Sequence, residues 1–278
     1  MILNFDLMKK EIYLLFGLFL LTQCEDPIEV EVNDSTQRLV VEASINWIKE
    51  TRQPEQEVVL SLTNSYFSDG TIPASGATVS ISDQNGTVYS FNEVENRGKY
   101  LPIEPIPYNI NEEFKLNIRF DGQDYTGVES LIAVASIDSI TQKTIFFFGE
   151  DRLQFDAYSV DPANERNYTF FEFMSDRLEA TEYNMYRDDF TEGNLYNGFL
   201  FGSDFEENDS IRFRQYGISK RAFNYWNLLI IQNTQQGGPF QTTPANLSGN
   251  MINTTNPENY PLGYFRVSEV SEILYSVK

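Results

Sequence analysis

Alternation of apolar and polar residues over short segments constrains the fold of this chain more than any other feature of its sequence. Residues 113–120 (EFKLNIRF) alternate without a break, turn at an Asp-Gly pair and return through residues 125–128. Residues 77–82 and 87–91 flank the sequence DQNG, and an Asn-Gly pair between two alternating segments is typical of a β-hairpin. Because a period of two residues places every second side chain on one face of a sheet, these segments are predicted to be strands.

The same pattern extends toward the N-terminus. Strands are predicted over residues 39–45 and 57–62, joined by a polar connection at 47–56 (WIKETRQPEQ). Thr, Ser, Val, Ile and Phe dominate these stretches, which favours β structure over helix. About six or seven strands over about 95 residues, with a turn every eight to twelve residues, are typical of a small β-sandwich. We therefore predict a β-sandwich domain at residues 38–136.

A second β-rich domain is predicted at residues 137–278. Its strands are expected at 154–160, 168–173, 195–201, 210–216, 263–267 and 273–275. Aromatic residues crowd this part of the chain at 146–148 (FFF), 170–171 (FF) and 183–186 (YNMY). One face of such a strand is expected to fill a core. The other face is either buried as well or exposed for contact with a protein or a glycan.

One sizeable helix is predicted near residues 219–232. Ser219 is a suitable N-cap because its hydroxyl oxygen is able to accept a hydrogen bond from the first turn. Phe223, Trp226 and Ile230 follow the spacing i, i+3 and i+7, which places them on one side of a helix. We expect this apolar face to close a core rather than to bind a cofactor.

The N-terminus has the pattern of a lipoprotein signal peptide over residues 1–23. Residues 12–21 are a run of apolar residues that follows Lys9 and Lys10. Ten residues rise only about 15 Å as a helix, half of a bilayer core, so the run is a signal-peptide core and not a membrane span. It leads into LTQC, which resembles the lipobox of bacterial lipoproteins, in which the cysteine, here Cys24, is diacylated and begins the mature chain. The alternative is a buried free cysteine after an ordinary secretory signal.

The residues after Cys24 are acidic. Glu25 and Asp26 resemble the export signal that sends Bacteroidota lipoproteins to the outer face of the outer membrane. We therefore expect a lipid anchor and exposure at the cell surface, with the periplasmic face as the alternative. Residues 24–37 are predicted to be an acidic tether. Within it, Ser35 is a candidate O-glycosylation site, because its Asp-Ser-Thr triplet resembles the sequon of Bacteroidota envelope proteins.

Composition excludes most enzyme mechanisms. The chain of 278 residues has no histidine and one cysteine, which rules out a Ser-His-Asp triad, an imidazole-bound metal and an intrachain disulfide. The sequence also lacks GxxxxGK[ST], GxGxxG, SxxK and GxSxG. We therefore predict no catalytic, metal-binding or cofactor-binding residues and no cofactor, with a carboxylate pair as the remaining enzymatic alternative. The net charge of −21, which loss of residues 1–23 leaves unchanged, disfavours nucleic acids as partners.

With the lipobox, the order of elements resembles a family of Bacteroidota outer-membrane lipoproteins, domain of unknown function 4249. The matching residues are LVVEASI (39–45), GATVSISDQNGTVYSF (76–91), GKY (98–100), EEFKLNI (112–118), SIDSI (136–140), DPANERNY (161–168), ISKRAFNYW (218–226), GGPFQTTPANLSGN (237–250) and LGYF (262–265). The resemblance implies an immunoglobulin-like N-terminal part and genes that often lie beside TonB-dependent transporters. It supplies no catalytic residues.

The expected protein is therefore mostly β, with an N-terminal immunoglobulin-like β-sandwich followed by a β-rich domain with one sizeable helix. We expect a non-enzymatic, lipid-anchored accessory protein that docks on an outer-membrane β-barrel transporter of the TonB-dependent type and assists substrate capture or gating. One alternative is a free-standing surface lipoprotein that binds a glycan or a peptide, with Tyr225 and Trp226 as stacking platforms. A carboxylate-dependent hydrolase is the weaker alternative.

Overall fold

The fold is mostly β, as the sequence predicts, and the described residues contain one helix. The structure is a computed structural model that describes residues 36–65, 68, 70–110, 112–147, 149–162, 166–188, 193–202, 204–234 and 247–278. Cys24, Glu25, Asp26, Ser35 and the predicted signal peptide lie outside these residues, so the predictions made for them remain predictions. Within the described part of the chain, no helix has both the length and the hydropathy that crossing a membrane requires.

The strands follow the alternation of the sequence, with apolar side chains buried at every second position. The first strand, for example, buries Leu39, Val41, Ala43 and Ile45. The elements are β1 (Leu39–Ile48), β2 (Pro54–Leu62), β3 (Ile72–Pro73), β4 (Thr78–Asp83), β5 (Val88–Val94), β6 (Lys99–Pro102), β7 (Glu113–Phe120), β8 (Gln123–Ser130), β9 (Ser139–Phe147), β10 (Glu150–Val160), β11 (Tyr168–Met174), β12 (Glu182–Arg187), β13 (Leu195–Gly202), β14 (Ser210–Gly217), α2 (Lys220–Thr234), β15 (Met251–Asn253) and β16 (Leu262–Ser276).

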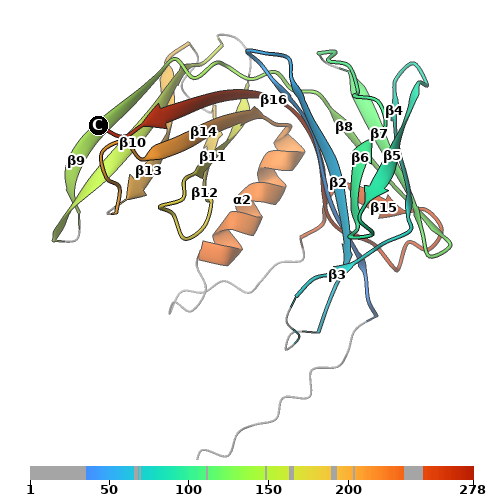
Figure 1. Cartoon of the computed structure of the whole chain (residues 1–278). Helices are drawn as coiled ribbons and strands as arrows, with labels where there is room; N and C mark the ends of the chain where they lie inside the picture. The colour runs from blue at the N-terminus through green and yellow to red at the C-terminus, as the bar shows by residue number, and fades with distance from the viewer. Residues whose placement is uncertain are drawn as a thin grey trace, which may run out of the picture. The chain divides into compact units, whose positions relative to one another are not determined.

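A single large sheet joins strands from both halves of the chain. Its order is β12-β11-β14-β16-β1-β2-β6-β5-β4-β7-β8-β15, and β3 pairs with β2. The junction is a parallel pair, in which residues 40–48 of β1 lie beside residues 262–270 of β16. A second sheet has the order β13-β10-β9. Figure 1 shows β16 running from the N-terminal strands to the C-terminal strands, with α2 beneath it. The predicted domain boundary between residues 136 and 137 remains a prediction.

Three groups of buried apolar side chains hold these layers together. The N-terminal strands enclose one core in a sandwich-like arrangement, the C-terminal strands enclose a second, and α2 covers a third against β11, β14 and β16. The largest buried members include Trp47, Phe114 and Tyr100 in the first core, Phe155, Phe171 and Phe213 in the second, and Phe170, Tyr216 and Phe223 in the third. Burial of such side chains is the main favourable contribution to folding.

Several predicted strands are confirmed. The hairpin around DQNG is formed by β4 and β5, and residues 113–120 form β7. The polar connection predicted at 47–56 is wrong at both ends, because Trp47 and Ile48 end β1 and β2 begins at Pro54. Trp47 is only 1% exposed, and its Nε1 donates a hydrogen bond to the carbonyl of Ile106. The burial of this side chain therefore extends the strand beyond its alternating part.

Other differences lie in the C-terminal half. The segments predicted at 263–267 and 273–275 belong to one strand, β16, which runs for 15 residues. Strands β9 and β12 were not predicted. Both have mostly exposed or partly exposed side chains, so their sequences carry no clear buried face that would mark them as strands.

The predicted helix is confirmed. The Oγ of Ser219 accepts a hydrogen bond from the backbone N–H of Ala222 at 3.1 Å, which is the geometry of an N-cap. Phe223 is buried, and Trp226 and Ile230 pack against the same core. The apolar face of α2 thus closes a core as expected, while part of it also faces the cleft described next.

Candidate functional site

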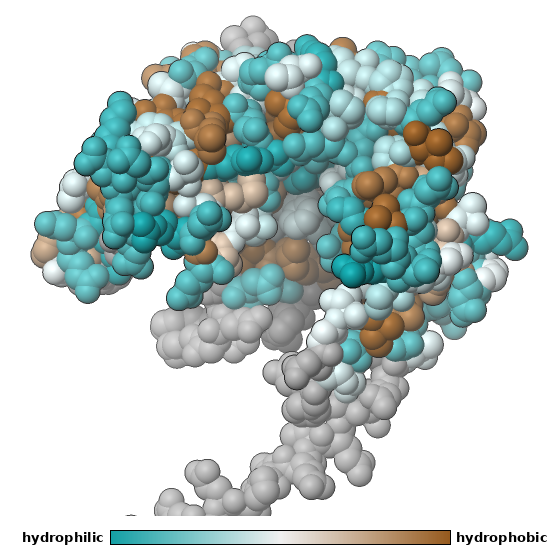
Figure 2. Space-filling view, in the orientation of Figure 1, coloured by the Kyte–Doolittle hydropathy of each residue, from teal (hydrophilic) through white to brown (hydrophobic). Residues whose placement is uncertain are grey.

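The strongest candidate site is a cleft of about 760 Å³ beneath the large sheet. One wall is α2, and the other is the face of β1, β2 and β16 that turns away from the N-terminal core. Figure 2 shows the molecule hollowed at this place. Four of the side chains that line the cleft are aromatic: Tyr183, Tyr225, Trp226 and Tyr264.

The register of β1 against β16 builds the sheet wall. Val41 and Ala43 pack into the N-terminal core, so their neighbours in β1 point to the opposite face. Glu42 lies opposite Tyr264 in β16, and Ser44 lies opposite Arg266. All four side chains therefore share the face that lines the cleft.

Aromatic contacts fix the helix wall. The ring of Trp226 lies 5.5 Å from Phe170 and 5.4 Å from Tyr225, and Tyr225 lies 4.9 Å from Tyr264. The Nε1 of Trp226 is buried and has no hydrogen-bond partner among the described residues. A buried donor without an acceptor costs about 1–3 kcal/mol, so an acceptor that reached this indole N–H would bind it favourably.

A cation completes the site. The guanidinium of Arg266 lies 4.1 Å from the ring centre of Tyr216, 5.4 Å from Phe170 and 5.9 Å from Trp226. Its Nε is buried and has no hydrogen-bond partner in the described part of the chain. Cation–π contacts of this kind hold a guanidinium in place without using its N–H donors.

Acidic and phenolic groups line the same cleft. Glu57 is paired with Lys99 at 2.7 Å, whereas Glu42 is exposed. Burial and the charge of Glu42 raise the pKa of Tyr225, and burial and the charge of Glu129 raise the pKa of Tyr264, whose hydroxyl donates to Glu129 at 2.6 Å. These phenols therefore stay neutral at pH 7 and act as hydrogen-bonding and stacking groups, not as bases.

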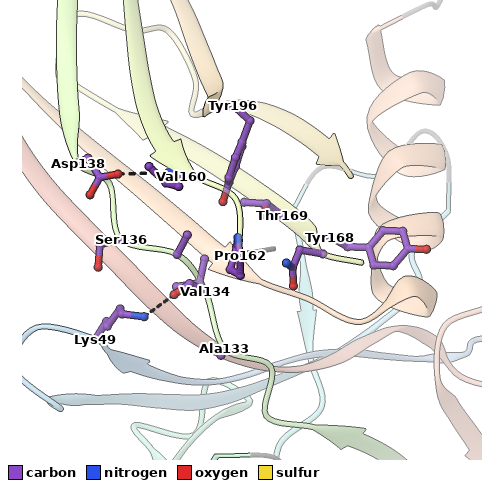
Figure 3. Close-up of a pocket in the computed structure, with 12 residues that line it drawn as sticks. Lys49, Ala133, Val134, Ser136, Asp138, Val160, Pro162, Tyr168, Thr169 and Tyr196 are labelled. Atoms are coloured by element: carbon purple, nitrogen blue, oxygen red, sulfur yellow. Dashed lines mark hydrogen bonds between the residues drawn. The ribbon is translucent and has the colours of Figure 1, made fainter. Parts of the chain in front are cut away.

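A second cavity, of about 390 Å³, lies between β10, β11 and the segment that follows β8. Figure 3 shows that its charged groups already have partners. Lys49 donates to the carbonyl of Val134 and pairs with Glu269, and the carboxylate of Asp138 accepts a hydrogen bond from the N–H of Val160 at 3.2 Å. Because its charged groups are satisfied within the protein, we regard this cavity as part of the framework.

The aromatic clusters noted in the sequence separate into two kinds. Phe170 and Phe171 are both buried. Phe146 is 75% exposed and Phe147 42% exposed, and Phe147 stacks on Phe201 at 5.8 Å. We define the aromatic patch as the exposed side chains Phe147, Phe199 and Phe201, whose rings contact one another on one face of the three-stranded sheet. Exposed aromatic clusters of this kind favour contact with another protein.

The sequence profile of the family described as Domain of unknown function (DUF4249) matches residues 25–273. The chain belongs to the DUF4249 family. A search among curated proteins found no match. In this DUF4249 protein, the described residues contain no group of three or more Asp, Glu or Cys side chains arranged to hold a metal ion.

The structure brings together residues that the sequence singles out and others that it does not. Tyr225 and Trp226, named as stacking platforms, line the cleft. Tyr183, from the aromatic cluster at 183–186, lines it as well. Glu42 and Arg266 were missed, because they join the cleft only through strand pairing that is distant in sequence. One signal for Arg266 is its position as a single charge within the otherwise apolar segment GYFRV.

Proposed function

We propose that this DUF4249 protein is a non-enzymatic, lipid-anchored accessory protein of a TonB-dependent outer-membrane transporter, and that it captures a substrate in the cleft between α2 and the large sheet. The observation that carries the capture function is the cleft itself, whose volume is large enough for a small ligand. It is lined by aromatic rings and by two residues, Trp226 and Arg266, that each have a buried N–H donor without an acceptor among the described residues. The N–H donors of Trp226 and Arg266 would fix the orientation of the ligand, and the aromatic rings would supply contact area.

The lipid anchor places the protein at the membrane surface. The family match begins at residue 25, directly after Cys24. Since two acyl chains give stable membrane attachment, the tether would hold the folded part close to a barrel in the same membrane. The effective concentration of the partner is then high, and a modest affinity suffices. The aromatic patch is the surface that we assign to this contact.

The anchor is tested by replacing Cys24. In Cys24→Ser, we expect the protein to leave the membrane fraction and appear in the soluble fraction, as followed by immunoblotting. The matched control is the double variant Glu25→Ser with Asp26→Ser. It is expected to stay in the membrane fraction but no longer to be exposed at the cell surface. Protease added to whole cells should therefore digest it less than wild type. Retention of Cys24→Ser in washed membranes would contradict lipid anchoring.

The capture function is tested at the helix wall. Purified protein is applied to arrays of glycans and peptides, and each ligand that binds is then titrated against variants. Trp226→Ala is expected to weaken binding by about tenfold or more, which corresponds to about 1.4 kcal/mol. Phe199→Ala, outside the cleft, is the matched control and is expected to bind normally. Equal affinities for wild type and Trp226→Ala would count against capture in this cleft.

The cleft also favours the second candidate function, a free-standing lipoprotein that binds a glycan or a peptide. The two proposals differ only in the partner. A map of the neighbouring genes separates them at low cost, since an accessory protein is expected beside a gene for a TonB-dependent barrel. A gene without such a neighbour in several related genomes would favour the free-standing protein.

A further inference from the structure

The surroundings of Arg266 indicate which chemical group the cleft binds. This inference extends the proposed capture function and rests on it. Arg266 is partly buried, its Nε lacks an acceptor, and no described carboxylate forms an ion pair with it. The contrast with Arg214, in the neighbouring strand β14, is direct. Arg214 forms two hydrogen bonds with Glu55, at 2.8 and 2.9 Å, and a third with Glu272 at 2.5 Å. Two arginines on adjacent strands thus differ completely in their anionic partners.

The aromatic rings around Arg266 hold its guanidinium in place but supply no hydrogen-bond acceptor. The ring of Tyr216 lies 4.1 Å from the guanidinium, and its hydroxyl donates to Glu172 at 2.5 Å. No hydrogen bond joins Arg266 to this hydroxyl among the described residues. Phe170 and Trp226 offer ring faces and no acceptor oxygen. Burying a charged donor without an acceptor is unfavourable, and buried polar groups in native proteins almost always have a partner. An arginine left in this state on the wall of a cleft indicates that its partner is supplied by a bound ligand and not by the described residues.

Two donors, one on the sheet wall and one on the helix wall, define the chemistry of that partner. The guanidinium of Arg266 and the indole of Trp226 lie 5.9 Å apart, and both lack an acceptor. A guanidinium binds a carboxylate through two parallel hydrogen bonds. We propose that Arg266, with the indole N–H of Trp226, forms a subsite for the carboxylate of a ligand whose body stacks on the aromatic wall.

The charge of the cleft favours a carboxylate over a phosphate. Arg266 carries one positive charge, Glu57 is neutralised by Lys99, and Glu42 lines the same cleft. A phosphate monoester carries about −1.5 to −2 at pH 7, so Glu42 repels it more strongly than it repels a carboxylate. The single charge of a carboxylate is balanced by Arg266 alone, whereas that of a phosphate is not. The carboxylate belongs either to an acidic sugar or to the C-terminus of a peptide, because both present the same planar group.

Matched pairs of probes test this subsite in the full-length protein purified in mild detergent. The sugar arm compares glucuronate with glucose, the peptide arm compares N-acetylphenylalanine with its amide, and glucose 6-phosphate serves as the phosphate probe. Binding is measured by isothermal titration calorimetry. In wild type, we expect at least one carboxylate to bind about tenfold or more tightly than its neutral partner. The arm that shows this preference identifies the source of the carboxylate.

Variants assign the preference to Arg266. Arg266→Gln is expected to bind the acid and its neutral partner equally, and Arg266→Lys to retain only part of the preference because an ammonium lacks the planar fork. Trp226→Phe keeps an aromatic ring and removes the N–H, so it should weaken the binding of the acid and the binding of its amide by different factors. Thermal unfolding identifies any variant that fails to fold, and Arg266→Lys and Trp226→Phe then carry the test.

Three outcomes would overturn the inference. They are equal binding of acid and neutral probes by wild type, an acid preference that survives Arg266→Gln, and no binding of either carboxylate at concentrations on the order of 10 mM. A ligand from the arrays that lacks a carboxylate but depends on Trp226 would overturn the carboxylate subsite while leaving the capture function in place. Array ligands that are indifferent to Trp226→Ala would instead contradict the capture function.

Discussion

Replacing Trp47 by alanine is expected to lower the free energy of unfolding by about 3–5 kcal/mol, as for other large aromatic side chains removed from a packed core. Trp47 is 1% exposed and packs against Tyr108 and Phe114 at ring distances of 6.1 and 5.9 Å. Its loss leaves a cavity where β1 meets the segment around Ile106. Unfolding in urea, followed by circular dichroism, measures the change.

Trp47→Phe is the matched control. It retains a ring but removes the N–H that donates to the carbonyl of Ile106. That carbonyl also accepts a hydrogen bond from Gln56 at 2.9 Å, so it stays satisfied, and the variant is expected to lose much less stability than Trp47→Ala. If Trp47→Ala destabilised the protein no more than Trp47→Phe, the assignment of Trp47 to the main core would be wrong.

Replacing Glu269 by glutamine is expected to lower the free energy of unfolding by about 3 kcal/mol at pH 7, because it breaks a buried ion-pair network. Glu269 is 2% exposed and pairs with Arg52 at 2.6 Å and Lys49 at 3.2 Å. It also accepts hydrogen bonds from the hydroxyl of Tyr108 and the N–H of Val134. Glu206→Gln, at an exposed pair with Arg177, is the matched control, with an expected loss of about 0–1 kcal/mol.

The effect of Glu269→Gln depends on pH in a defined direction. Burial opposes ionisation of Glu269, but hydrogen bonds from Val134 and Tyr108 and the nearby cations outweigh it and lower its pKa below the usual value. The ionised carboxylate therefore stabilises the fold at pH values above the pKa of the unfolded chain, and this contribution is lost as the pH falls through the pKa of the folded state. The difference between wild type and Glu269→Gln should shrink toward zero on acidification. A difference that stays constant down to about pH 3 would contradict this role.

Local patterns in the sequence predict those parts of the fold that local interactions determine. The hairpin around DQNG, strand β7 and the Ser219 cap of α2 each follow from neighbouring residues. The parallel pairing of β1 with β16 joins segments more than 200 residues apart, and no local pattern indicates which strand lies beside which. Strands β9 and β12 were missed for a related reason, since pairing with neighbours, and not their own alternation, makes them strands.

The candidate site divides in the same way. Tyr225 and Trp226 lie on a predicted helix and attract attention as aromatic residues in the sequence. In the sequence, Arg266 is only a single charge within an apolar strand, and Glu42 is only one polar position in an alternating strand. Their common face depends on the register of β1 against β16, so the cleft becomes visible only when that pairing is known.

The most direct test of the proposed function is co-purification of the full-length, lipidated chain from its own membrane in mild detergent. We expect a TonB-dependent outer-membrane barrel to be recovered with wild type and identified by mass spectrometry. The double variant Phe199→Ser with Phe201→Ser, in the aromatic patch, is expected to lose the barrel, whereas Trp226→Ala, in the cleft, is expected to retain it. Repeated recovery of the wild-type protein alone would contradict an accessory role at a transporter.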